Sequence, residues 1–319
     1  MTTEVNNEVN IEATEAAESK KAKTYDTPAY KARKRKFGDR CDGRRLRTLD
    51  GVHVATAFVM RERNDACNQF AEEVNISKAD EFVRQQLMAG NEGFSLLHVI
   101  LAAYVRAISQ YPYLNRFVSG QRIFARHKIE VLMVVKKAMN LSAPETSINV
   151  IFDPRDTVFD VYERFNEQVI KATTTTNETD GIAGFFGKLP RGIFKAAINV
   201  IKSLDYVGLC PKVLTENLPF WGSMIITSMG SLGIKPIYHH LYNLGNLPVF
   251  ISYGTKRKVY ELDRNGNVNT KKVVDLKVVT DERTCDGFQY ATAFKAFKKY
   301  IENPDILLTP PEKVVEDID

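Results

Sequence analysis

Long apolar runs are missing from this sequence. No stretch of about 18 consecutive apolar residues occurs, so no membrane-spanning helix is expected. Met1 to Ser19 is acidic and polar and has no apolar core, which argues against a secretory signal peptide. Cysteine is scarce too, and the four residues lack C-x-x-C spacing. We therefore expect free thiols in a reducing, cytoplasmic setting and no zinc or other metal site.

Charge is unevenly distributed along the chain. There are 44 Lys and Arg residues against 39 Asp and Glu, but Lys20–Arg47 alone holds twelve basic residues and three aspartates. The remainder is therefore mildly acidic. The basic segment, 20–47, predicts either a solvated arm or a weak contact with polyanions or an anionic membrane surface. No known nucleic-acid-binding motif accompanies it, which favours the solvated arm.

The sequence divides into four parts. Residues 1–23 have few apolar groups and are expected to form a disordered acidic N-terminus, followed by a basic arm over 24–50. Residues 51–308 have globular character and enough apolar content for a sizeable core. Residues 309–319 are expected to form a loose acidic tail.

Apolar spacing predicts strands and helices inside the globular part. Ser77 is expected to cap a helix that ends near Met88, and 94–110 carries a broad apolar helical face. Ser119-Gly120 predicts a hairpin turn. Strands are expected over 67–76, 128–136, 146–152, 223–227 and 248–253, a hairpin over 256–280, and further helices over 156–173, 190–204 and 288–301. Because this order lacks regular βαβ alternation, it predicts an α+β domain with a mixed sheet.

Three sequence blocks carry a family resemblance. Residues 74–83 read VNISKADEFV, 225–233 read IITSMGSLG, and a third block over 281–308 begins with DERTCDG. In this order and spacing they resemble the CoA-dependent acyltransferases, the family of chloramphenicol acetyltransferase and of the dihydrolipoyl acyltransferase cores of 2-oxoacid dehydrogenase complexes. The resemblance covers residues 50–308. It implies a chloramphenicol-acetyltransferase-like fold, in which helices flank a mixed β-sheet.

The resemblance implies acyl transfer between a thioester and an acceptor. Such a reaction needs a base that takes the proton of the acceptor and a donor that stabilises the tetrahedral oxyanion. The family base is a histidine, and Glu282 stands at its position here. The hydroxyl of Thr227, or alternatively that of its neighbour Ser228, is implied as the oxyanion donor.

The resemblance also assigns residues to the support of the site. Arg283, Asp286 and Gly287 are implied as structural support, and glycine permits a tight turn into the following helix. The family aspartate pairs with an arginine. Asp286 is therefore expected to pair with an arginine of the 44–47 segment.

Glutamate in place of the histidine leaves the function open. A carboxyl group has a reference pKa of about 4.3 and is a weak base at neutral pH unless burial raises that pKa. His239 and His240 offer an alternative base, because adjacent residues of an extended segment face opposite sides. The sequence thus supports two functions. One is a CoA-dependent acyltransferase with an altered base, and the other is a non-catalytic homologue, a pseudoenzyme that binds a ligand or builds assemblies.

Partners follow from the resemblance as well. Family members place their active sites between subunits, so we expect a homotrimer in which one chain supplies the 225–233 block and its neighbour the 281–308 block. CoA or acyl-CoA is the expected substrate, and no tightly bound cofactor is expected. No lipoyl-domain motif precedes the core in this sequence, so the chain is expected to act by itself.

Overall fold

The structure is a computed structural model that describes residues 35–136, 145–174 and 190–319. The expected disordered N-terminus, 1–23, and the first part of the basic arm lie outside these ranges. Contacts between Cα atoms assign Lys36–Asp319 to one unit.

Within the described residues, the main sheet of this unit has seven strands. They are β2 (Cys67–Asn75), β5 (Ile129–Lys136), β6 (Glu145–Phe152), β7 (Met224–Ser228), β8 (Val249–Tyr253), β9 (Arg257–Leu262) and β10 (Val268–Asp281). The order across the sheet is β2-β10-β8-β7-β5-β6, and β9 pairs with the first half of β10. The pairs β5–β7 and β7–β8 are parallel, whereas β8–β10, β2–β10 and β5–β6 are antiparallel. The expected mixed sheet is therefore present.

A smaller sheet joins the chain's early residues to the hairpin predicted at Ser119-Gly120. Its strands are β1 (Gly43–Arg45), β3 (Arg116–Ser119) and β4 (Arg122–Arg126), in the order β1-β4-β3. A Cβ atom on Gly120 would lie 2.1 Å from the carbonyl oxygen of Tyr206, so only glycine fits at this turn. Because β1 belongs to the 24–50 segment, the second half of the basic arm is part of the folded unit.

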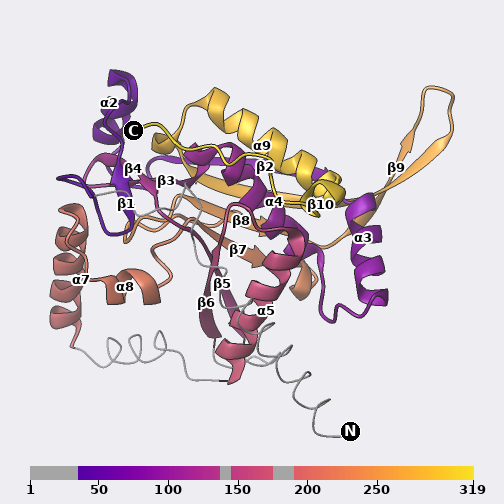
Figure 1. The fold of residues 1–319 in the computed structure, drawn as a ribbon, viewed down its shortest axis with the longest axis horizontal. Helices are drawn as coiled ribbons and strands as arrows, with labels where there is room; N and C mark the ends of the chain where they lie inside the picture. The colour runs from indigo at the N-terminus through magenta and orange to yellow at the C-terminus, as the bar shows by residue number, and fades with distance from the viewer. Residues whose placement is uncertain (1–34, 137–144, 175–189) are drawn as a thin grey trace, which may run out of the picture. The chain divides into compact units, whose positions relative to one another are not determined.

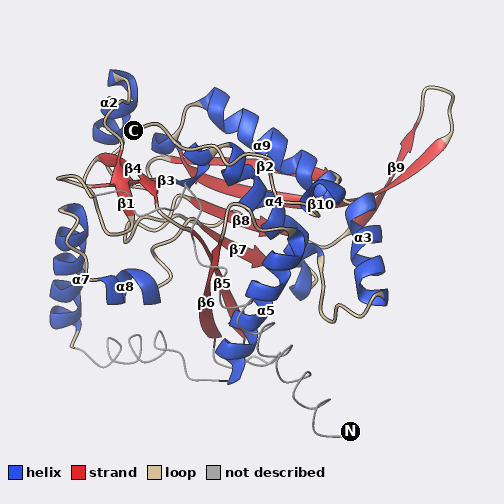
Figure 2. Ribbon diagram, viewed as in Figure 1, coloured by secondary structure: helices blue, strands red, loops and turns tan. Residues whose placement is uncertain are grey.

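Four helices cover one face of the main sheet: α3 (Ser77–Met88), α4 (Leu96–Gln110), α5 (Val158–Thr174) and α9 (Gly287–Glu302) (Figures 1 and 2). The helix α2 (Gly51–Val59) contacts β4 of the smaller sheet, and α7 (Arg191–Tyr206) and α8 (Lys212–Asn217) contribute Ile201 and Leu214 to a cluster around Trp221. The rings of Phe70 on β2 and Phe294 on α9 lie 5.0 Å apart and join the sheet to the helical layer. The rings of Tyr104 on α4 and Phe297 on α9 lie 6.1 Å apart and join two helices of that layer. Among the described helices, none is long and apolar enough to cross a membrane.

The segment 234–247 packs on the opposite face of the sheet. Leu241 and Leu247 form a buried cluster with Ile225 of β7, Phe250 of β8 and Val279 of β10. Side chains alternate along a strand, so the residue two positions after Ile225 lies on this same face. That residue is Thr227.

Two expectations about local structure need correction. Ser77 is the first residue of α3 and does not cap it, because its hydroxyl donates to Asn75 Oδ1 at 2.8 Å and accepts from the backbone N–H of Lys272 at 3.0 Å. The acidic tail is not loose. The backbone N–H of Val315 donates to Ser109, and Asp317 accepts two hydrogen bonds from Arg116 at 2.7 and 2.6 Å.

Candidate functional site

The turn at 281–287 is fixed by a buried ion pair. It connects β10 to α9 through η3, a short 3-10 helix over Glu282–Thr284. Arg283 donates to the Asp281 carboxylate through Nε at 2.8 Å and Nη2 at 2.7 Å, and both residues are almost fully buried. Arg283 Nη1 donates further to the carbonyls of Met60 and Arg61, both at 3.0 Å. A buried charge pair with these additional hydrogen bonds holds its backbone firmly, since separating the pair would leave a buried charge uncompensated.

Glu282 lies exposed on this rigid turn. Its backbone N–H donates to the carbonyl of Ala66 at 2.8 Å, and its side chain points to solvent. Arg63 adds a second positive charge beside the neighbouring Asp281, with Arg63 Nε 3.5 Å from Asp281 Oδ2. Within the described part of the chain, no hydrogen bond or ion pair engages the Glu282 carboxylate, so it is free to meet a group that comes from outside this chain.

Asp286 and Gly287 begin the helix α9. Asp286 Oδ1 accepts from the backbone N–H of Gln289 at 2.8 Å, and the Gln289 side chain accepts from the backbone N–H of Asp286 at 3.3 Å. This reciprocal arrangement is a capping box, and Asp-x-x-Gln spacing was a signal for it in the sequence. A Cβ on Gly287 would meet no heavy atom within 4 Å, so the space around this residue does not demand glycine.

The expected pairing of Asp286 with an arginine of the 44–47 segment is wrong. Within the described residues, the Asp286 carboxylate accepts from the backbone N–H of Gln289, and the arginines contact other groups. Arg44 Nη2 donates to the carbonyl of Asp317 at 2.6 Å, and Arg47 Nη2 donates to Asp39 at 2.9 Å. The reason is that the C-terminal residues return to the N-terminal segment and offer it acceptors. The order of residues along the chain gave no sign of this contact.

Thr227 and Ser228 end β7, and both are half-buried. The chain then enters η2 (Gly230–Leu232), where the Ser231 hydroxyl donates to the Ser228 carbonyl at 2.7 Å. A Cβ on Gly230 would lie 2.5 Å from the carbonyl oxygen of Gly254, so the turn lies against the end of β8 with no room for a side chain. This close approach explains the glycine in the 225–233 block.

Thr227 and Glu282 lie far apart within one chain. Thr227 is paired with Ser252 on β8, and Ser252 is paired with Lys277 on the antiparallel strand β10. Glu282 follows five residues after Lys277, so at about 3.3 Å per residue it lies roughly 16 Å further along the sheet. A base and an oxyanion donor must both reach the same reacting group. One chain therefore does not bring the two expected catalytic residues together.

The two histidines have different surroundings. The ring of His239 stacks on Phe250, with centroids 4.2 Å apart, and His240 is exposed. Burial, with a smaller contribution from His240, lowers the pKa of His239, and its buried Nε2 has no hydrogen-bond partner in the described structure. Phe250 and Ser252 share one face of β8, so His239 lies on the same face of the sheet as Thr227.

A cavity of about 400 Å³ lies beside the 281–287 turn. Its walls come from the α2–β2 connection, the β3–β4 turn, α7 and the loop before β8. Basic side chains outnumber acidic ones in the lining, which favours an anionic ligand. The basic residues are Arg61, Arg63, Lys202 and Arg283, and the acidic ones are Glu62 and Asp205. Sequence analysis missed most of this site because its walls come from four separate segments.

Metal binding and catalysis by a cysteine nucleophile have little support in the described ranges. No group of three or more His, Cys, Asp or Glu residues there could hold a metal ion. Burial raises the pKa of Cys285 to about 11, so this thiol is protonated at neutral pH and is a poor nucleophile.

Residues 221–309 match the family 2-oxoacid dehydrogenases acyltransferase (catalytic domain). The chain is similar to a probable dihydrolipoamide acetyltransferase from Listeria monocytogenes, with 16% identity over 80% of this chain and 93% of that chain and a TM-score of 0.52. It is also similar to the dihydrolipoamide acetyltransferase of Azotobacter vinelandii, with 12% identity over 81% and 88% of the two chains and a TM-score of 0.53. No curated protein matches the sequence. The fold is thus that of the dihydrolipoamide acetyltransferases, as the resemblance implied.

Proposed function

We propose that this protein is a CoA-dependent acyltransferase with an altered catalytic base. The observation that carries the proposal is that the segment matched to the acyltransferase family, 221–309, contains both Thr227 and Glu282 within a fold of that kind. Acetyl-CoA or another acyl-CoA is the donor, and a thiol or hydroxyl is the acceptor.

The site is completed by another copy of the chain, in a homotrimer. This step rests on the separation of Thr227 and Glu282, which a second chain removes by placing its own 281–287 turn against the end of β7. Exposed apolar side chains follow Thr227 and provide surface for such a contact. They are Leu232, Ile234, Ile237 and Tyr238.

The chemistry assigns one role to each end of the sheet. Glu282 takes the proton of the acceptor as the acceptor attacks the thioester carbon, and the Thr227 hydroxyl, with Ser228 as the alternative, donates to the oxyanion. Collapse of the tetrahedral intermediate breaks the carbon–sulfur bond, and the CoA sulfur leaves with the proton held by Glu282. His239 is the alternative base, because it lies on the Thr227 face.

The basic cavity beside the turn would hold the phosphates of CoA. Arg61 and Lys202 are exposed in its lining, whereas Arg63 and Arg283 are tied to Asp281. We therefore assign the binding of phosphate to the first two. Charge-assisted hydrogen bonds from such groups to phosphate are among the strong ones in proteins.

A direct assay tests the proposal. Purified protein is mixed with acetyl-CoA and dihydrolipoamide, and the acetylated thiol is followed by mass spectrometry while light scattering measures the assembly. We expect turnover by a trimer, and a large loss of turnover in Thr227→Val with the assembly unchanged. A stable monomer without turnover would remove both the shared site and the activity.

A non-catalytic homologue is the second candidate. The observation that favours it is the exposed, negatively charged Glu282, because a carboxylate opposes a neighbouring thiolate or oxyanion. Such a protein would still bind CoA, which a shift in melting temperature would show, but the wild type and Glu282→Gln would be equally inactive. Glu282→His would then restore some transfer.

Weak polyanion or anionic-membrane contact through 20–47 remains a further proposal. Three of its arginines are already engaged within the folded unit, since Arg40 pairs with Asp42, Arg47 with Asp39, and Arg44 with the C-terminal residue. Retention on heparin should therefore fall steeply with salt and disappear when residues 1–34 are removed. Retention that does not respond to salt would contradict an electrostatic contact.

A further inference from the structure

The basic cavity beside the 281–287 turn contains two carboxylates that could cancel its positive charge. Arg61 and Lys202 are its exposed basic residues, and Glu62 and Asp205 line it as well. The other two lining arginines are already paired with Asp281, so the two carboxylates would balance the exposed cations one for one. A cavity balanced in this way would attract anions only weakly. The attraction for an anionic ligand therefore depends on what compensates the carboxylates.

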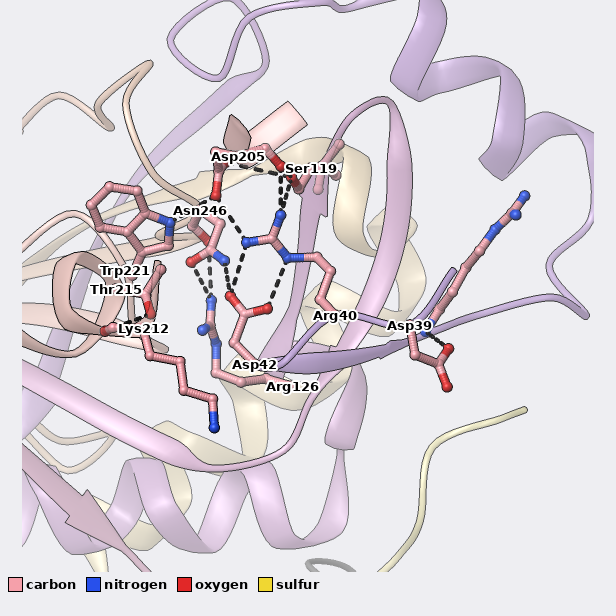
Figure 3. Close-up of polar contacts among 12 residues, drawn as sticks. Asp39, Arg40, Asp42, Ser119, Arg126, Asp205, Lys212, Thr215, Trp221 and Asn246 are labelled. Carbon is pink, nitrogen blue, oxygen red and sulfur yellow. Dashed lines mark hydrogen bonds and ion pairs between the residues drawn. The ribbon is translucent and has the colours of Figure 1, made fainter. Parts of the chain in front are cut away.

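Asp205 is held in a buried hydrogen-bond network below the cavity (Figure 3). Arg40 Nη2 donates to Asp205 Oδ1 at 2.8 Å, and Trp221 Nε1 donates to the same oxygen at 3.0 Å. The backbone carbonyl of Asp205 accepts from Arg40 Nη1 at 2.6 Å and from the Ser119 hydroxyl at 2.8 Å. Arg40 and Asp205 are only 3% and 7% exposed, so salt and water screen their attraction little. Arg40 thus compensates the charge of Asp205.

Arg40 is available to Asp205 because its other acidic partner has a second cation. Arg40 Nε donates to Asp42 Oδ1 at 2.8 Å, and the amide of Asn246 donates to Asp42 Oδ2 at 2.7 Å. Burial opposes the ionisation of Asp42, but Arg40 and, to a smaller extent, Arg126 hold the pKa of Asp42 below its usual range. Two arginines therefore serve two aspartates, and neither carboxylate is left as an uncompensated buried charge.

The same pairing leaves Lys202 free. Lys202 and Asp205 are three residues apart on α7, a spacing at which oppositely charged side chains of a helix meet. Asp205 is nevertheless paired with Arg40, and Lys202 is exposed and makes no ion pair with any residue that the structure describes. Without Arg40, Asp205 would attract Lys202, one of the two residues to which the binding of phosphate is assigned.

We propose that Arg40 is a positioning residue of the basic cavity. By pairing with Asp205, it compensates the carboxylate that would otherwise cancel Lys202, and it thereby makes the cavity selective for anions. The identity of the anion, the phosphates of CoA, rests on the proposed function. The role of Arg40 does not, because it follows from the charges alone. Arg40 belongs to the 24–50 segment, so the folded half of the basic arm contributes to the site.

Charged thiol reagents test the sign of the charge in the cavity without any ligand. Gln121, which lines the cavity, is replaced by cysteine, and its rates of reaction with an anionic and a cationic methanethiosulfonate are compared by mass spectrometry of the peptides. We expect the anionic reagent to react faster, and the ratio of the two rates to fall about fivefold when Arg40→Met is added. Adding Asp205→Asn to Arg40→Met should restore the ratio. Arg47→Met, which removes an arginine of the same segment that is paired with Asp39, should leave it unchanged.

Two outcomes of this experiment would overturn the proposal. One is an unchanged ratio in folded Arg40→Met. The other is a ratio that stays low in the double variant, because the effect of Arg40 would then be structural and would not act through Asp205. If Arg40→Met alone fails to fold, the double variant still decides, since it lacks both charges of the pair and its ratio should equal that of the parent.

Inorganic pyrophosphate is the probe for ligand binding, because it carries a diphosphate group without the rest of CoA. Calorimetric titration should show about tenfold weaker binding in Arg40→Met and restored binding in Arg40→Met/Asp205→Asn. Equal affinity in the wild type and folded Arg40→Met would contradict the role of Arg40. A wild type that shows the expected response to the charged reagents but binds no pyrophosphate would support that role and contradict the phosphate site of the proposed function.

Discussion

The two ends of the main sheet differ in the groups that they bury and expose. At the 281–287 turn, the ionic groups of Asp281 and Arg283 are 1% and 2% exposed, and they bond to each other and to neighbouring carbonyls. At the end of β7, the turn after Thr227 is followed by apolar side chains such as Leu232, which is 60% exposed. The ionic groups of the first end are complete within one chain, although Phe288, next to the turn, is 84% exposed. Both ends therefore present apolar surface of the kind that proteins cover with a partner, which supports the proposed shared site.

Replacing Glu282, the exposed carboxylate of the 281–287 turn, should have the largest effect on acyl transfer. Glu282→Gln removes the proposed base, so acyl transfer should fall about 10²- to 10⁴-fold while CoA binding stays nearly constant. Steady-state kinetics and calorimetric titration measure the two quantities, and Glu81→Gln, another exposed glutamate, serves as the control. Turnover that survives Glu282→Gln but is lost in His239→Gln would identify His239 as the base.

Breaking the ion pair tests whether the first end is self-contained. Asp281→Asn leaves the buried charges of Arg283 and Arg63 without a counter-charge, which should lower the free energy of unfolding by about 3–5 kcal/mol. Urea unfolding measures the loss, and the exposed Asp305→Asn should cost far less. A loss as small as that of the control would show that the turn does not depend on this pair.

The neighbouring aspartate should matter less, although it belongs to the same sequence block. Asp286→Ala removes one helix cap at a solvent-exposed position, so it should lower the free energy of unfolding by about 1 kcal/mol. The same urea experiment measures it, and Asp286→Ser, which keeps a capping hydroxyl, should restore most of the loss. A cost equal to that of Asp281→Asn would mean that Asp286 has a buried partner after all.

Low pH should lower the free energy of unfolding slightly through His239, which lies on the same face of the sheet as Thr227. Burial lowers its pKa below the unfolded value of about 6.5, so between the two pKa values the unfolded chain binds more protons than the folded one. Stability is therefore complete above about pH 6.5 and falls as the pH drops through this window. The effect should stay below about 1 kcal/mol because the ring is partly exposed. Unfolding of wild type and His239→Gln between pH 5 and 7.5 would measure it, and identical curves would contradict it.

Local patterns were sufficient for most of the elements. The broad apolar face over 94–110 became α4, and the expected strand over 67–76 became β2. The helix α2 was not predicted, because Val52, Val54 and Phe58 are exposed and form no apolar stripe. Its signal was the cap, since Asp50 accepts from the backbone of Val52 and His53. Short helices with exposed apolar residues lack the periodicity on which such predictions depend.

The sequence by itself determined the fold, through the apolar periods of its helices and strands and the three blocks that resemble acyltransferases. It also made Thr227 and Glu282 the candidate catalytic residues, which stay predictions, but it did not predict the helix cap formed by Asp286. Only the tertiary structure decided which charges meet: Arg283 pairs with Asp281, Arg116 with Asp317, and Arg40 with Asp42. The reason is physical. Backbone periodicity is a property of neighbouring residues, whereas the partner of a buried charge depends on which distant segments share its low-dielectric surroundings.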